Sequence, residues 1–171
     1  MQLKASIDYG LRAVLYLADK GTVCSSKDIA NDMSIPRDYL IQLAQLLRNA
    51  GVIEARPGKY GGYYLAKDPS EISVLDVLNA LEGTTKRSAD SKREERMAKV
   101  EDEGVKRAYG LVEESLETYL SSLTIEVLLE GSKEGADSKQ FLADRLAEES
   151  ERLGGDSVGG FVLGADSPAE D

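Results

Sequence analysis

Side chains that could bind a nucleic acid are concentrated between residues 37 and 60. The amide of Gln42 suits the N6 and N7 atoms of adenine, and the guanidinium of Arg37 suits either a guanine edge or a phosphate. Arg56 and Lys59 belong to a Gly-rich segment, where a cation can follow the phosphates or enter a narrow minor groove. These residue types favour DNA as a partner, although each also suits an ordinary solvated position.

The sequence offers little for catalysis or metal binding. It has no histidine and a single cysteine, Cys24, which excludes Ser-His and Cys-His nucleophilic sites, a Cys/His zinc site within one chain, and an internal disulfide. We therefore expect no enzyme, no metal site and no cofactor. Cys24 precedes an expected helix, whose N-terminus could lower the thiol pKa and permit redox sensing; core packing is the alternative.

The charge of the chain is divided unevenly along its length. The net charge is −10, yet residues 1–70 carry nine Lys and Arg against seven Asp and Glu. Residues 71–171 therefore carry the acidity, so the N-terminal part is the one compatible with phosphate. No run of 18 uncharged apolar residues and no leader-like N-terminus occurs, which predicts a cytoplasmic protein with no membrane partner.

Hydrophobic periodicity predicts three helices in the first fifty residues. Apolar residues spaced by three and four span residues 3–17, and Gly21 ends that helix. A short second helix begins at Ser25 or the next residue, where a capping-box pattern occurs. Pro36 starts a third helix that continues to about Asn49.

A β-hairpin follows these helices. Residues 52–56 and 63–66 have strand character, the turn between them is rich in glycine, and residues 73–83 form another amphipathic helix. Two short helices joined by a tight break and followed by a basic hairpin are typical of a winged helix-turn-helix. We expect a mainly α fold with a small β-hairpin wing, in which residues 1–83 form a DNA-binding domain. Its expected contacts with DNA are Arg37, Asp38, Tyr39, Ile41, Gln42, Arg56, Lys59 and Tyr60.

The C-terminal half is expected to supply self-association. Residues 84–104 form a charged loop or helix, and a long apolar stripe then runs from Val105 to Val127, which a second copy of the chain would cover. A dimerisation helix with a short following helix is assigned to 105–130, a weak amphipathic helix to 131–153, and a disordered acidic tail to 154–171. The residues expected at the dimer interface are Val105, Ala108, Val112, Leu116, Tyr119, Leu120 and Leu123.

An ordered set of motifs resembles the Rrf2 family of bacterial transcription regulators. The similarity covers about residues 1–83 in order and continues more loosely through the long helix. The motifs that carry it are Ile7–Ala13, Ile35–Leu43, Leu47–Ile53 and Gly61–Lys67, followed by residues 72–83.

The resemblance implies a dimer whose long helices cross and present two recognition helices to a palindromic operator. Many members of the family bind an iron-sulfur cluster through three cysteines in the loop that corresponds to residues 84–104, and some add a carboxylate at the position of Asp8. This chain has no cysteine in that loop. We therefore expect no cluster, because one carboxylate cannot replace three thiolates. A second departure is Ile41, where the family often has an acidic residue: an apolar side chain could contact a thymine methyl group but could not accept from cytosine.

Two functional hypotheses remain open from the sequence. The favoured one is a homodimeric, cluster-free regulator, expected to be a repressor, whose effector is a small molecule or a partner protein. The alternative is a protein-interaction adaptor or partner-controlled regulator whose winged domain has reduced DNA affinity. The retained cationic hairpin favours DNA binding over the adaptor.

Overall fold

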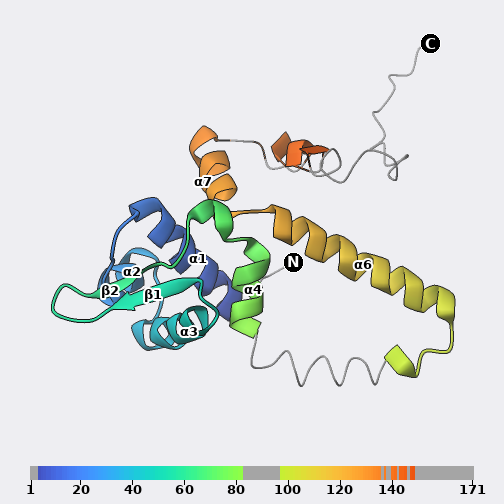
Figure 1. Ribbon diagram of the computed structural model, residues 1–171, viewed down its shortest axis with the longest axis horizontal. Coiled ribbons are helices and arrows are strands. Elements are labelled where there is room, and N and C mark those ends of the chain that lie inside the picture. The colour runs from blue at the N-terminus through green and yellow to red at the C-terminus, as the bar shows by residue number, and fades with distance from the viewer. Residues whose placement is uncertain are drawn as a thin grey trace, which may run out of the picture. The chain divides into compact units, whose positions relative to one another are not determined.

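The computed structural model describes residues 4–82, residues 97–135 and single positions between 137 and 148 (Figure 1). The chain divides into two compact units, Met1–Gly135 and Ala136–Asp171, and the elements that concern function belong to the first. The expected acidic tail at 154–171 and residues 84–96 of the expected charged loop lie outside the described residues. None of the helices in the described part of the chain is both long and apolar enough to cross a membrane.

Three helices open the fold, and local capping sets their ends. Helix α1 spans Ala5–Lys20 and ends at Gly21, which adopts the left-handed conformation with φ of 59°. Helix α2 spans Ser26–Asp32, and the Ser25 hydroxyl caps it by accepting from the Asp28 N–H at 3.1 Å. Helix α3 spans Arg37–Asn49 and begins directly after Pro36. These ends confirm the boundaries that the sequence predicts.

The hairpin after α3 forms the wing. Strand β1, Ile53–Arg56, pairs antiparallel with β2, Gly62–Leu65, and Ile53 faces Leu65 in the register. Cys24 extends this ribbon by an isolated bridge to Tyr63, with N···O distances of 2.9 and 2.8 Å in the two directions. Gly62 is required there, because a Cβ atom would lie 2.0 Å from the Cys24 carbonyl oxygen. The wing is thereby tied to the residue just before the α2 cap.

The core lies between α1, α2, α3 and the helix that follows the wing. A 3-10 turn at Pro69–Glu71 leads to α4, Val74–Glu82, whose start is capped by Ser73 and Asp76 in both directions. Helices α1 and α4 approach closely: a Cβ atom on Gly10 would lie 2.4 Å from Leu81 Cδ1. Side chains from all the packed elements are almost completely buried, namely Val14, Ile29, Leu40, Leu47, Ile72 and Val77.

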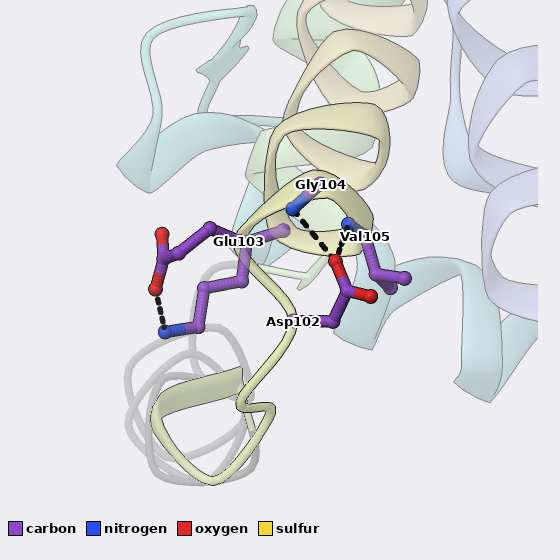
Figure 2. Close-up of polar contacts among 5 residues, drawn as sticks. Asp102, Glu103, Gly104 and Val105 are labelled. Atoms are coloured by element: carbon purple, nitrogen blue, oxygen red, sulfur yellow. Dashed lines mark hydrogen bonds and ion pairs between the residues drawn. The ribbon is translucent and has the colours of Figure 1, made fainter.

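The long C-terminal helix is α6, Glu103–Ser122. Its first turn is capped by Asp102, whose Oδ1 accepts from the N–H groups of Gly104 and Val105 at 2.8 and 3.1 Å (Figure 2). Figure 2 also shows the ion pair between Glu103 and the Lys106 ammonium, at 2.7 Å. The helix therefore begins close to where the apolar stripe begins in the sequence.

The expectation of an apolar stripe continuing along one helix to Val127 is wrong at Leu123. The chain breaks there, and α7 restarts at Ile125–Glu134 with Thr124 as its cap. The break has a long-range cause: the Val74 N–H donates to the Leu123 carbonyl and the Ile125 N–H donates to the Ile72 carbonyl, both at 2.8 Å. Leu123 is consequently 7 % exposed and packs within its own chain, which corrects its expected place at the dimer interface.

Candidate nucleic-acid interface

Helix α3 presents a mixed face to solvent. Leu40, Leu43 and Leu47 point into the core, while Asp38, Ile41, Gln42 and Gln45 are exposed. The helix packs beside β1, so the wing follows immediately next to this face (Figure 1). A helix with such a face fits the major groove of B-DNA, where its first turns meet the base edges.

Arg37 is positioned at the start of α3 by a neighbouring helix. Its Nε donates to Ser26 Oγ, in the first turn of α2, at 3.2 Å. The Arg37 side chain stays exposed, and its remaining N–H groups are free to bind an anion. The sequence left guanine and phosphate open for Arg37; this anchoring beside α2 favours a phosphate.

Tyr39 packs against the first helix. It is partly buried, and its ring meets the Tyr9 ring edge-on, with centroids 5.9 Å apart and an interplanar angle of 80°. Of the two roles that the sequence allowed for Tyr39, packing is the one with contacts in the structure.

Arg12 joins this cluster, although it was not predicted from the sequence. Its guanidinium lies 5.6 Å from the Tyr9 ring centroid, forms an ion pair with Asp8 at 2.7 Å, and donates to the Met33 carbonyl in the helix-turn-helix break at 3.4 Å. The spacing of Asp8 and Arg12 by four residues in a helix was the available signal. Asp8 is thus held by a cation on its own helix.

The wing carries cations and an aromatic ring in the open. Arg56, Lys59 and Tyr60 are all exposed, Tyr60 to 85 %, and the Lys59 ammonium lies 5.6 Å from the Tyr60 ring centroid. The loop depends on glycine: Gly58 has φ of 109°, and a Cβ atom on Gly61 would lie 2.1 Å from the Arg56 carbonyl oxygen. At the base of the wing the Tyr64 hydroxyl donates to Glu54, which raises the pKa of Tyr64.

Cys24 is a buried thiol whose pKa is raised. Its Sγ donates to the Thr22 carbonyl at 3.4 Å, and burial is the main cause of the raised pKa. The direction is opposite to the lowering that a helix N-terminus would bring, because desolvation disfavours the thiolate. The geometry supports packing, the alternative to redox sensing.

The chain does not fit an iron-sulfur cluster. Thiolates are the ligands that such clusters use, and the whole sequence has one cysteine and no histidine. Cys24 is buried beside the wing, and Asp8 is paired with Arg12. Among the described residues, no three carboxylate or thiol side chains gather in a way that could hold a metal ion.

Helix α6 exposes an apolar stripe. Val105, Val112 and Leu116 are each more than half exposed. Ala108 is also exposed, and Tyr119 and Leu120 are half-buried near the end of the helix that contacts α4. Tyr109, 44 % exposed, belongs to the same stripe by its spacing of four from Val105, although it was not predicted at the interface.

These elements define a winged helix-turn-helix protein with a DNA-binding fold. The chain belongs to the Rrf2 family, whose model matches residues 3–131 and is described as an iron-dependent transcriptional regulator. The family membership and the fold class predicted from the sequence are therefore confirmed.

Solved structures and curated relatives agree with this assignment. The chain is similar to IscR of T. potens, with 28 % identity, a TM-score of 0.64 and coverage of 82 % of this chain and 96 % of that one. It is also similar to CymR (YrzC), the global cysteine regulator of B. subtilis, with 29 % identity, a TM-score of 0.59 and coverage of 74 % and 94 %. These relatives are transcriptional regulators, so this chain is a regulator and not an enzyme.

A protein of Mycobacterium tuberculosis strain H37Rv, named as an HTH-type transcriptional regulator, is 35 % identical over 85 residues. That match covers 48 % of this chain and 53 % of the relative. The chain thus spans about half the length of the curated relatives it matches.

Proposed function

We propose that the chain binds a palindromic DNA operator as a homodimer and represses transcription there without an iron-sulfur cluster. The observation that carries the proposal is the exposed face of α3, with Asp38, Ile41 and Gln42, directly beside a wing that exposes Arg56 and Lys59. In this arrangement α3 enters the major groove and the wing follows the adjacent phosphates or minor groove.

Dimerisation is proposed to use the apolar stripe of α6. Val105, Val112 and Leu116 expose apolar surface along more than half of the helix, and such a surface favours association with a second copy. A two-fold dimer would present two copies of α3, which is why the operator should be palindromic.

Independence from a cluster follows from the ligand set. With one buried thiol per chain, a dimer has too few thiolates for a four-ligand cluster. Purified protein should show no visible iron-sulfur absorbance and no stoichiometric iron and sulfide. A chromophore with stoichiometric iron would contradict this part of the proposal.

The central experiment is selection of bound duplexes from a random DNA pool, followed by a reporter assay. We expect enrichment of a two-fold symmetric sequence, and reduced transcription from a promoter that contains it. Absence of any enriched sequence would contradict operator binding and favour the protein-interaction adaptor. Enrichment with raised transcription would retain the DNA reader and overturn repression.

A further inference from the structure

The exposed polar groups of α3 differ in whether the protein already uses them. In the second half of the helix, Gln45 Nε2 donates to Asn49 Oδ1 at 2.8 Å and Arg48 Nη1 donates to Gln45 Oε1 at 3.5 Å. In the first half, the side chains of Asp38 and Gln42 have no hydrogen-bond partner among the described residues. The uncommitted groups therefore lie in the turns that a recognition helix directs at base edges.

Ile41 lies among these uncommitted groups. It is 43 % exposed, and within residues 4–82 the structure exposes only two large apolar side chains to this extent, Ile41 on α3 and Tyr60 on the wing. Both belong to the elements that are proposed to face DNA. An isoleucine cannot donate or accept a hydrogen bond, and the apolar group that a base pair displays in the major groove is the thymine C5-methyl group.

We propose that Ile41 recognises the methyl group of a thymine in each half-site, flanked by polar contacts from Asp38 and Gln42. This inference rests on the proposed operator binding and specifies its chemistry. The carboxylate of Asp38 can accept from an amino group of cytosine or adenine, and the amide of Gln42 can pair with adenine. The 5-methyl group is then a determinant that uracil, with the same pairing edge, lacks.

The test uses the operator selected with the wild-type protein. Each thymine of a half-site is replaced by deoxyuridine, symmetrically in both half-sites, and affinity is measured by fluorescence anisotropy. Burial of one methyl group predicts a loss of about fourfold per half-site at one thymine position, so about fifteenfold for the dimer. Ile41→Ala should bind the thymine and uracil duplexes equally at that position.

Matched variants separate the methyl contact from general effects on α3. Gln45→Ala changes a neighbouring exposed position whose amide is already bonded to Asn49, and it should keep the uracil sensitivity of the wild type. Ile41→Val should keep part of it. Alanine favours helix at an exposed position, and circular dichroism checks that Ile41→Ala folds.

The outcomes distinguish this inference from the proposed function. If an operator is enriched but no uracil substitution weakens the wild type, Ile41 does not read a methyl group, while operator binding stands. The same conclusion follows if Ile41→Ala retains the full uracil sensitivity. If no operator is enriched at all, the proposed function fails and the inference with it.

Discussion

Arg37 Nε on α3 donates to Ser26 Oγ on α2 at 3.2 Å, which holds the guanidinium at the N-terminal ends of two successive helices. The N-terminal ends of helices carry unsatisfied N–H groups and attract anions. A guanidinium held there is well placed for a phosphate of the DNA backbone, which positions a protein without reading sequence.

Arg37→Ala should therefore weaken binding to operator and random duplexes alike. Removing one phosphate interaction per protomer predicts a decrease of the salt slope, log Kd against log salt concentration, of about two for a dimer. Ser26→Ala should act in the same direction but more weakly, because it removes only the positioning bond. A weakening confined to the operator would show instead that Arg37 reads a base.

Gln42 and Lys59 should respond in different ways to truncation. Lys59→Ala should weaken binding to all duplexes and reduce the salt slope by about two in a symmetric dimer, and Arg56→Ala should behave alike. Gln42→Ala should cost roughly 1 to 3 kcal/mol per half-site on the operator and little on random DNA. If Gln42→Ala and Lys59→Ala both left operator affinity unchanged at near-physiological salt, the DNA reader would be excluded.

Helix ends were predictable from the sequence because single residues decide them. Gly21 has φ of 59°, a conformation that favours glycine, and the Ser25 side chain accepts from the first turn of α2. Pro36 can begin a helix but cannot continue the preceding one. In these cases the residue type and the backbone requirement are local to each other.

The break at Leu123 was not predictable in this way. Apolar spacing continues across it, so periodicity favours one uninterrupted helix, whereas the break depends on pairing with Ile72 and Val74, far away in the sequence. Thr124, a residue type that caps helices, was the available local signal. The site shows the same limit: residue types indicated a DNA-facing helix, but the commitment of Gln45 to Asn49 is a matter of geometry.

Leu116→Asp should convert the dimer to a monomer. Leu116 is 55 % exposed on the apolar stripe of α6, and association would bury an unpaired charge there. The mass measured by light scattering at micromolar concentration should fall from twice the chain mass to 18.5 kDa. Arg107→Asp introduces the same residue on the opposite, charged side of α6 and should leave the dimer intact. A wild-type chain that is monomeric and folded would contradict the proposed interface.

Tyr16 should make stability depend on alkaline pH. Its hydroxyl donates to Asp32 at 2.7 Å, and this hydrogen bond, with burial and the Asp32 charge, raises the pKa of Tyr16 to about 12. The unfolded value is about 10. Because the folded pKa is the higher one, the contribution is complete below about pH 10 and is lost as the pH rises through about 12.

The denaturation midpoint of wild type should accordingly exceed that of Tyr16→Phe at neutral pH, and the difference should shrink above about pH 10. Tyr60→Phe is the control, since the Tyr60 ring is 85 % exposed at the wing. A difference between wild type and Tyr16→Phe that did not change up to about pH 12 would show that the hydroxyl titrates elsewhere.

Cys24 should be inert toward oxidants in the folded protein. Burial raises the pKa of its thiol, so the thiolate that reacts with peroxide or with a disulfide reagent is scarcer than in an exposed cysteine at neutral pH. Thiol labelling of native protein should be slow and should become fast in denaturant. Peroxide should leave operator affinity unchanged in wild type and in Cys24→Ala. Loss of binding in the wild type alone, reversed by a reductant, would make Cys24 a redox switch and would overturn its assignment as a packing residue beside the wing.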